Sequence, residues 1–249
     1  MKRKVALVTG SNRGIGKSCI EDFARAGVNV VINYCHHEDE AEELEKYIKE
    51  NYDVEVLTIK CDISKEEEVE QMVDEIIEVF GGIDILVNNA SVARDSLLMD
   101  KNIKEFKRVL DVNLIGTYLV SKYVGKVMLD QKYGKIINVS STNAIDTYYP
   151  ESCDYDASKA ALISLTHNLA IQCSPYVNVN AIAPGFIGTE SELDGYDQQF
   201  LQQETEKILL KRYGKPQEVA YLVKFLISDQ AQFINNSVIR IDGGQLSST

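Results

Sequence analysis

Short apolar runs alternate along the chain with longer stretches in which apolar and polar residues are mixed. The apolar runs predict strands near residues 5–8, 28–33, 54–60, 83–87, 135–139, 177–182 and 237–241. The mixed stretches predict helices near residues 14–26, 38–50, 65–79, 102–130, 155–174 and 216–228. Strands that are apolar throughout and alternate with helices are typical of a parallel sheet covered on both faces. The pattern therefore predicts an α/β fold: a single doubly wound domain over residues 1–249, with a seven-stranded parallel sheet and an additional helical segment near 188–213.

Composition narrows the possible partners. The net charge of -12, without a basic stripe, argues against a nucleic-acid partner. No run approaches the roughly 18 apolar residues of a membrane span, so no membrane association is expected. The five cysteines are odd in number and scattered, which favours neither a disulfide framework nor a metal site. The first apolar run ends at Thr9, too early for a signal peptide, and a cytoplasmic location is expected.

A glycine-rich segment, Thr9–Gly16, lies between the first predicted strand and the first predicted helix. Glycines there allow a tight turn and a close approach of the backbone to a pyrophosphate, which the helix N-terminus attracts. Glycines also serve ordinary turns, but this position favours a dinucleotide site. The residues expected to contact it from this turn are Gly10, Asn12, Arg13, Gly14, Ile15 and Gly16.

Further motifs follow the predicted strands in a fixed order from residue 4 to the carboxyl end. They are Asn88-Asn89-Ala90 followed by Ser91, Asn113, Ser141, Tyr155 with Lys159, Pro184-Gly185 with Thr189, and Asp242-Gly243-Gly244. Together with the Thr-Gly-x-x-x-Gly-x-Gly turn, this series resembles the short-chain dehydrogenase/reductase family, and its ketoacyl-carrier reductases as closely as any subgroup. Ser91 departs from the family's Asn-Asn-Ala-Gly, where the fourth residue is glycine.

The resemblance implies a Rossmann fold and an enzyme that transfers hydride between a nicotinamide dinucleotide and a carbonyl or secondary alcohol carbon. It implies that Lys159 contacts the nicotinamide ribose and that Asn113 orders a water in a proton relay. Other cofactor contacts are expected around the adenine, along the strand ends and at the carboxamide. These residues are Asn33, Tyr34, Asp62, Ile63, Asn89, Ala90, Pro184, Gly185, Ile187 and Thr189, in addition to Tyr155 and Lys159.

Two Tyr-x-x-x-Lys pairs compete for the catalytic role. Tyr118 and Lys122 lie inside an apolar run, where helix packing explains them. Tyr155 and Lys159 follow a polar loop after the fifth predicted strand, which places them at the carboxyl edge of the sheet, where open α/β folds bind ligands. The second pair is therefore expected to be catalytic.

The chemistry of this pair is that of a general acid and base. A phenol titrates near ~10, and a neighbouring cation at i+4 is expected to lower the pKa of Tyr155 toward neutrality. Ser141 can hydrogen-bond the same substrate oxygen, with Ser140 and Thr142 as alternatives because the spacing from Ser141 to Tyr155 is slightly long.

Cofactor preference depends on the end of the second predicted strand. Residues 33–37 read Asn-Tyr-Cys-His-His, without the carboxylate that would accept the ribose 2′-hydroxyl of NAD. Arg13 is placed to meet a 2′-phosphate, so NADP is expected and NAD is less favoured. His36 and His37 do not suggest a metal, because adjacent side chains of an extended chain point apart.

The expected substrate is a free small molecule with a carbonyl or alcohol group. Asp146, Glu151 and Asp154 are expected to make the rim near Tyr155 acidic, and Lys132 and Lys135 are expected to offset part of that negative charge. An acidic rim would repel an acidic carrier protein. A 3-oxoacyl-(acyl-carrier-protein) reductase is the alternative, and a dinucleotide-binding sensor or scaffold without turnover is a second one. The predicted helices at 102–130 and 155–174 are apolar on more than one face, which by the resemblance implies a homotetramer.

Overall fold

The computed structural model describes residues 3–246, in which seven strands form one sheet with the order β3-β2-β1-β4-β5-β6-β7. Every neighbouring pair is parallel. The strands are β1 (Val5–Val8), β2 (Asn29–Tyr34), β3 (Val56–Lys60), β4 (Ile85–Asn88), β5 (Gly134–Val139), β6 (Val177–Pro184) and β7 (Val238–Ile241). This arrangement confirms the predicted α/β class and the seven-stranded Rossmann-type sheet.

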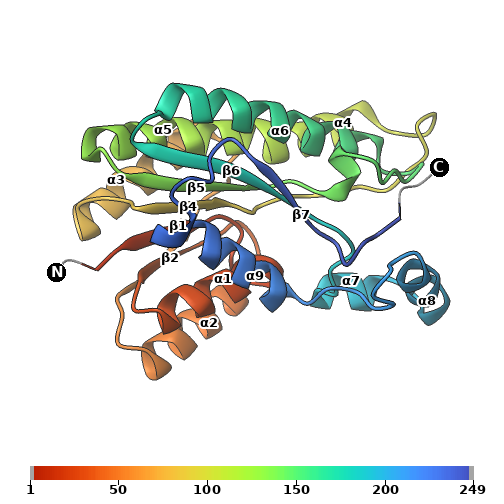
Figure 1. Ribbon diagram of the computed structural model, residues 1–249, viewed down its shortest axis with the longest axis horizontal. Helices are drawn as coiled ribbons and strands as arrows, with labels where there is room; N and C mark the ends of the chain where they lie inside the picture. Colours follow the sequence, from red (N-terminus) through yellow and green to blue (C-terminus); the bar gives the residue numbers. More distant parts are fainter. Residues whose placement is uncertain (1–2, 247–249) are drawn as a thin grey trace.

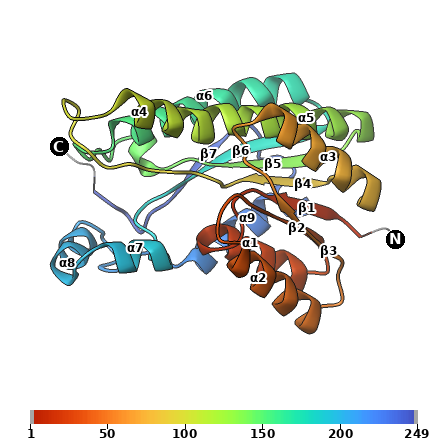
Figure 2. The same cartoon turned by 180° about the vertical axis from the view of Figure 1, so that it is seen from behind.

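Helices cover both faces of the sheet, as Figures 1 and 2 show. One layer contains α3 (Glu66–Phe80), α4 (Ile103–Leu110), α5 (Thr117–Gln131) and α6 (Cys153–Cys173). The opposite layer contains α1 (Gly14–Arg25), α2 (Glu38–Asn51) and α9 (Pro216–Leu226). Successive side chains of a strand point to opposite faces. Accordingly, Val5 and Leu7 of β1 join the core under α3 and α5, whereas Ala6 and Val8 join the core under α1 and α9.

The stretch predicted as one helix over 102–130 is interrupted. A π-helical segment, Asp111–Gly116, separates α4 from α5 and contains the buried Asn113. The sequence pattern does not reveal the break because the chain stays helical through it. Such π segments are frequent at functional sites.

The strand order reverses between β1 and β4. The chain moves outward from β1 to β3, returns to β4 and then moves outward in the other direction to β7. Loops after β1 and β4 therefore diverge and leave a crevice at the carboxyl edge of the sheet, where such folds bind ligands.

Two short helices, α7 (Glu190–Gly195) and α8 (Gln198–Glu206), lie beyond this carboxyl edge (Figure 1). They correspond to the helical segment expected near 188–213. The Thr189 and Asp197 side chains accept hydrogen bonds from the first turns of α7 and α8. Isolated β-bridges from Ile187 to Gly214 and from Ile208 to Gln245 tie the segment to the rest of the chain.

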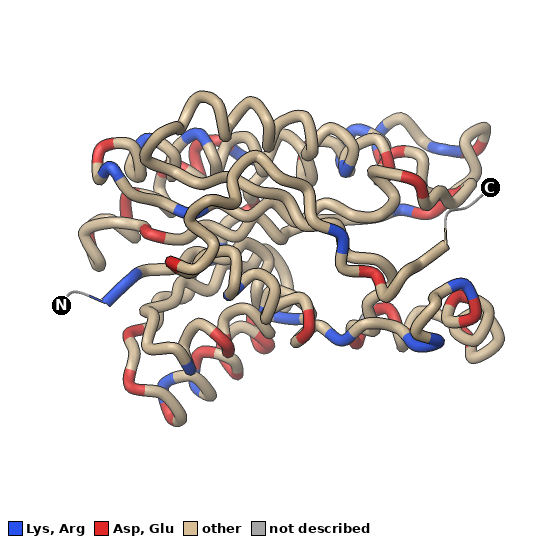
Figure 3. The backbone as a smooth tube through the Cα atoms, in the orientation of Figure 1, with Lys and Arg blue, Asp and Glu red and all other residues tan. Residues whose placement is uncertain are grey.

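Charged residues are spread over both layers. Lys and Arg alternate with Asp and Glu along the backbone tube in Figure 3. Within residues 3–246, no helix is both long and apolar enough to span a bilayer.

Candidate active site

A cleft of about 1170 Å³ runs along the carboxyl edge of the sheet. It brings together most of the residues that the sequence singled out. Those lining it are Gly10, Asn12, Arg13, Ile15, Asn33, Asp62, Ile63, Asn89, Ala90, Ser141, Tyr155, Lys159, Pro184, Gly185, Ile187 and Thr189. Four predicted residues lie outside the lining: Gly14, Gly16, Tyr34 and Asn113.

The glycine turn forms the floor of the cleft between β1 and α1. Gly10 has φ +58°, and a Cβ added there would lie 2.9 Å from the Cα of Ala90. A Cβ on Gly16 would lie 2.7 Å from the carbonyl oxygen of Gly10. No side chain caps the N-terminus of α1, where Arg13 is the N-cap residue. An uncapped helix start beneath an open cleft is a site for a phosphate group, so the turn fits the diphosphate of a dinucleotide.

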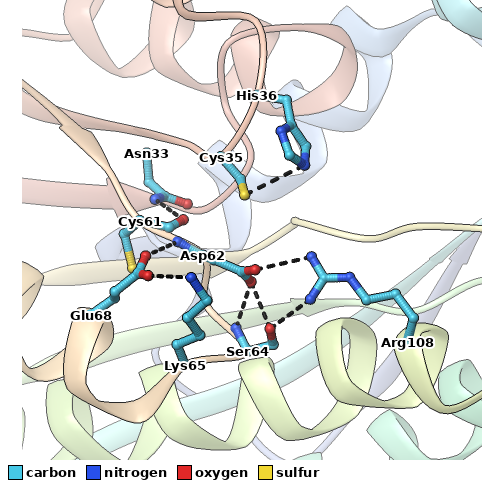
Figure 4. Close-up of polar contacts among 9 residues, drawn as sticks. All are labelled: Asn33, Cys35, His36, Cys61, Asp62, Ser64, Lys65, Glu68 and Arg108. Atoms are coloured by element: carbon cyan, nitrogen blue, oxygen red, sulfur yellow. Dashed lines mark hydrogen bonds and ion pairs between the residues drawn. The ribbon is translucent and has the colours of Figure 1, made fainter. Parts of the chain in front are cut away.

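At the β2–β3 end of the cleft, a polar cluster formed by Asp62, Ser64 and Arg108 lies below Cys35 and His36 (Figure 4). Arg108, from α4, donates to the Asp62 carboxylate at 3.1 Å and to the Ser64 hydroxyl at 2.7 Å. Burial alone would raise the pKa of Asp62, but hydrogen bonds from Ser64 and Arg108 outweigh it and lower that pKa.

Sequence reasoning missed Arg108 because no motif includes it; it lies on a predicted helix, five residues before Asn113. It adds a guanidinium to the same end of the cleft as Arg13, His36 and His37. Within residues 3–246, no group of three or more His, Cys, Asp or Glu side chains is arranged to hold a metal ion.

Asn33 lies near the carboxyl end of β2, in the stretch that contains no carboxylate. Its side-chain oxygen accepts from the Gly10 N–H at 3.1 Å, and its amide donates to the Cys61 carbonyl at 3.2 Å. It therefore links the glycine turn to both β2 and β3. The adjacent Tyr34 points to the other face of the sheet, and its hydroxyl donates to Glu38 at 2.8 Å, which accounts for its place outside the cleft.

Tyr155, Ser141 and Lys159 converge in the middle of the cleft. Tyr155 and Lys159 lie one turn apart near the start of α6, and Ser141 follows β5. The Lys159 ammonium lies 5.4 Å from the centroid of the Tyr155 ring and donates to the Val139 carbonyl at 2.8 Å.

The protonation of this trio differs from the sequence-based expectation. Burial raises the pKa of Tyr155, and the hydrogen bond with Ser141 lowers it by less. Burial lowers the pKa of Lys159 to about 7. The expected lowering of the Tyr155 pKa by a full lysine cation is therefore wrong for this structure, because the lysine is itself desolvated.

A backbone contact distinguishes Ser140 from Ser141. Ser140 donates its hydroxyl to the backbone carbonyl of Lys159 at 2.8 Å, so it supports α6. The competing tyrosine, Tyr118, is 45% exposed on α5, and Lys122 pairs with Glu66 at 2.6 Å. Neither Tyr118 nor Lys122 lines the cleft.

Asn113 is fully buried behind the cleft. Its side chain accepts from the Val92 N–H at 2.8 Å, donates to the Val92 carbonyl at 3.0 Å and donates to the Ser158 hydroxyl at 3.0 Å. It thus joins the loop after β4 to α6 beside Lys159. In this geometry Asn113 is a positioning residue, and its part in a water relay stays a prediction. Ser91, in the same loop, is outside the left-handed region, so its side chain is accommodated without backbone strain.

The rim near Tyr155 is less acidic than the sequence suggested. Asp154 is fully buried, and its carboxylate lies 3.1 Å from the Lys101 ammonium. Asp146 pairs with Arg240 at 2.7 Å, which leaves Glu151 as the acid of this loop that lines the cleft.

The expected counterweight from Lys132 and Lys135 is wrong. Lys132 precedes β5 and Lys135 is its second residue, so both lie where the parallel strands begin, at the edge of the sheet opposite the carboxyl edge. Lys135 is also buried and donates to Asn178 at 2.7 Å.

The β6 end of the cleft carries aromatic and acidic side chains. Tyr196 and Phe200 stack with ring centroids 4.3 Å apart, and Phe186 meets Phe200 edge-on at 6.5 Å. Tyr149 closes the opposite wall and donates to the buried Glu204 at 2.5 Å. The acids lining this end are Asp95, Glu151 and Glu192.

Known proteins resemble the chain over nearly its whole length. The family model described as enoyl-(acyl-carrier-protein) reductase matches residues 10–245. A 3-oxoacyl-(acyl-carrier-protein) reductase of Synechocystis is 38% identical over 98% of this chain and 97% of its own. A 3-oxoacyl-(acyl-carrier-protein) reductase of Aquifex aeolicus is also 38% identical, over 98% of each chain. Glucose 1-dehydrogenase 2 of Bacillus subtilis is 34% identical over 97% of this chain and 94% of its own. A solved mutant of a Serratia marcescens short-chain dehydrogenase/reductase has a TM-score of 0.91 and 33% identity, and covers 97% of both chains.

The fold, the cleft and these similarities define a Rossmann-type oxidoreductase. Within that class, the chain belongs to the short-chain dehydrogenase/reductase family.

Proposed function

We propose that this protein uses NADPH in preference to NADH to reduce the carbonyl of a free small molecule, or catalyses the reverse oxidation of a secondary alcohol. The observation that carries the proposal is the convergence of Tyr155, Ser141 and Lys159 in a cleft whose floor is an uncapped helix start. The nicotinamide dinucleotide, when bound, supplies or accepts the hydride.

The chain's own residues move and hold the proton. Tyr155 gives its phenolic proton to the carbonyl oxygen in reduction and takes it back in oxidation. Burial raises the pKa of Tyr155, so in the ligand-free protein the phenol holds its proton at neutral pH and can donate it. Ser141 donates to the same oxygen and stabilises the negative charge that develops on it. Lys159, held by the Val139 carbonyl, faces the ring of Tyr155 and is placed to bind ribose hydroxyls.

The NADP preference rests on charge at the β2–β3 end of the cleft. Arg13 is exposed at the turn, and Arg108 lies across the same end. The Asp62 carboxylate at that end already forms an ion pair with Arg108. A guanidinium binds a phosphate through two parallel hydrogen bonds, which suits the 2′-phosphate of NADPH.

A 3-oxoacyl-(acyl-carrier-protein) reductase is the second candidate, favoured by the names of two relatives. An assay of nicotinamide absorbance with acetoacetyl carrier protein and with free ketones, sugars and sterols separates the two. We expect the free compounds to give the higher kcat/KM. A carrier-linked substrate that wins by tenfold or more would contradict the choice, and no turnover of any compound would favour a dinucleotide-binding sensor or scaffold.

We also propose that the protein is a cytoplasmic homotetramer. Ile115 and Tyr118 near the start of α5 and Ile171 on α6 are exposed on one layer of the molecule, and burial of such residues favours self-association. Light scattering at micromolar concentration should give four times the mass of one chain, and a monomeric mass would contradict it. The five free cysteines fit a reducing compartment.

A further inference from the structure

Glu192 stands out at the β6 end of the cleft. It belongs to α7 and lines the cleft with Tyr155. Among the described residues, its carboxylate has neither a hydrogen-bond donor nor a cationic partner, although the side chain is partly buried. The Glu192 oxygens are not among the fully buried unpartnered atoms, so they still reach the open cleft. A substrate that displaces water from them must supply hydrogen-bond donors in its place, because a carboxylate left without a donor costs free energy.

Glu192 shares the cleft lining with Tyr155 and Tyr196. Its charge raises the pKa of Tyr155 and of Tyr196, in each case after the larger effect of burial. Burial and the neighbouring charge of Asp95 raise the pKa of Glu192 itself. One acid therefore affects both the catalytic phenol and the aromatic wall of the cleft.

The surrounding charges do not neutralise this acid. Asp95, Glu151 and Glu192 line this end of the cleft, and among the described lining residues Arg94 is the cation next to them. The stacked rings of Tyr196 and Phe200 add apolar faces. Acceptors beside aromatic faces suit a compound that carries several hydroxyl groups on an otherwise apolar carbon skeleton.

We propose that Glu192 is a specificity-determining residue that accepts hydrogen bonds from hydroxyl groups next to the reacting carbon, and that the substrate is therefore a polyhydroxylated ketone or alcohol. This inference rests on the proposed oxidoreductase function and names its substrate class. A 3-oxoacyl thioester offers no donor beside its keto group, so binding it would leave Glu192 desolvated and unpaired.

The test compares substrates that differ only in hydroxyl groups. Dihydroxyacetone is paired with 3-pentanone for reduction with NADPH, and myo-inositol is paired with cyclohexanol for oxidation with NADP. We expect the hydroxylated member of at least one pair to have a kcat/KM about tenfold higher or more, as for a hydrogen bond to a charged group. Aminoacetone, compared with 2-butanone, tests for a cationic substrate instead.

Two variants assign the preference to one side chain. Glu192→Leu should reduce the hydroxylated-to-plain ratio of kcat/KM at least fivefold. Glu190→Leu, a matched change on an exposed residue of the same helix that lies outside the cleft, should leave the ratio unchanged. Three results would overturn the inference while the oxidoreductase function stands. They are equal kcat/KM values within both pairs, a hydroxylated-to-plain ratio of kcat/KM that is unchanged in Glu192→Leu, and a kcat/KM advantage of aminoacetone over 2-butanone that exceeds the advantage of the hydroxylated compounds. Absence of turnover with every compound, acetoacetyl carrier protein included, would overturn the proposed function as well.

Discussion

The ammonium of Lys101 lies 3.1 Å from the carboxylate of Asp154, and the two side chains are only 3% and 0% exposed. Lys101 also donates to the backbone carbonyl of Arg94, and Asp154 accepts from the N–H of Tyr155. One buried ion pair therefore fixes the loop after β4 against the first turn of α6. The backbone N–H of Tyr155 is anchored directly by this pair.

Removing one partner should destabilise the fold strongly, because the other charge remains buried without compensation. Lys101→Met is expected to lower the free energy of unfolding by about 3–5 kcal/mol. The double variant Lys101→Met with Asp154→Leu should recover most of that loss, since neither charge remains. Urea unfolding monitored by circular dichroism measures both values. A loss under about 1 kcal/mol in the single variant would show that the pair is dispensable.

Tyr155→Phe should retain the fold and dinucleotide binding while turnover falls by about 10²–10⁴-fold, because only the acidic hydroxyl is lost. Tyr118→Phe is the control, since Tyr118 belongs to the other Tyr-x-x-x-Lys pair and lies outside the cleft. It should be nearly silent. Steady-state rates and dinucleotide fluorescence titration measure the two properties, and an unchanged rate in Tyr155→Phe would remove Tyr155 from the mechanism.

The protein should bind NADPH more tightly than NADH, and Arg13→Ala should reduce this difference in affinity. The expected change is about tenfold in the ratio of dissociation constants, as for a charged hydrogen bond lost from a phosphate. Isothermal titration with both dinucleotides gives the ratio directly. The prediction is refuted if the unaltered protein binds NADH more tightly.

The buried lysine should make the ligand-free protein more stable as the pH rises. The pKa of Lys159 is lowered to about 7 in the fold, against 10.5 as its ordinary value. Below about pH 7 both states hold the proton and the effect is constant. Between about pH 7 and 10 the unfolded chain holds a proton that the folded chain has released, so the free energy of unfolding increases with pH.

The increase that depends on Lys159 should be about 2 kcal/mol between pH 7 and 9, at about 1.4 kcal/mol for each pH unit once the folded form has lost its proton. Comparison of the unaltered protein with Lys159→Met at each pH isolates it, since the cysteines titrate alike in both. An identical pH dependence in the two proteins would mean that the lysine stays charged in the fold.

Much of the fold and of the site was predictable because it rests on local patterns. Apolar runs located every strand to within two residues, and the glycine turn and Tyr155 were placed correctly at the carboxyl edge because parallel strands all end there. The π-helical break at Asn113 was not predictable, since the chain is helical on both sides of it and a single wider turn leaves no distinct mark on the apolar pattern.

Contacts between segments that are distant along the chain could not be predicted from the sequence. Nothing marks Lys101 as the partner of Asp154, which is why the latter was mistaken for part of an exposed rim. Arg108 was overlooked for the same reason, because it lies on α4, 46 positions along the chain from its partner Asp62. Lys132 and Lys135 were predicted to lie near Tyr155, although most of the length of β5 separates them from the cleft.

The order of the strands separates the two ends of the cleft. The end at β2 and the end at β6 are four strand spacings apart, or about 19 Å. Effects of substitutions at that separation, without shared partners, generally add in free energy. Substitutions at Arg13 and Glu192 should therefore have independent effects. A substitution that alters coenzyme preference and one that alters substrate preference can then be combined in a single chain, and each should retain its full effect.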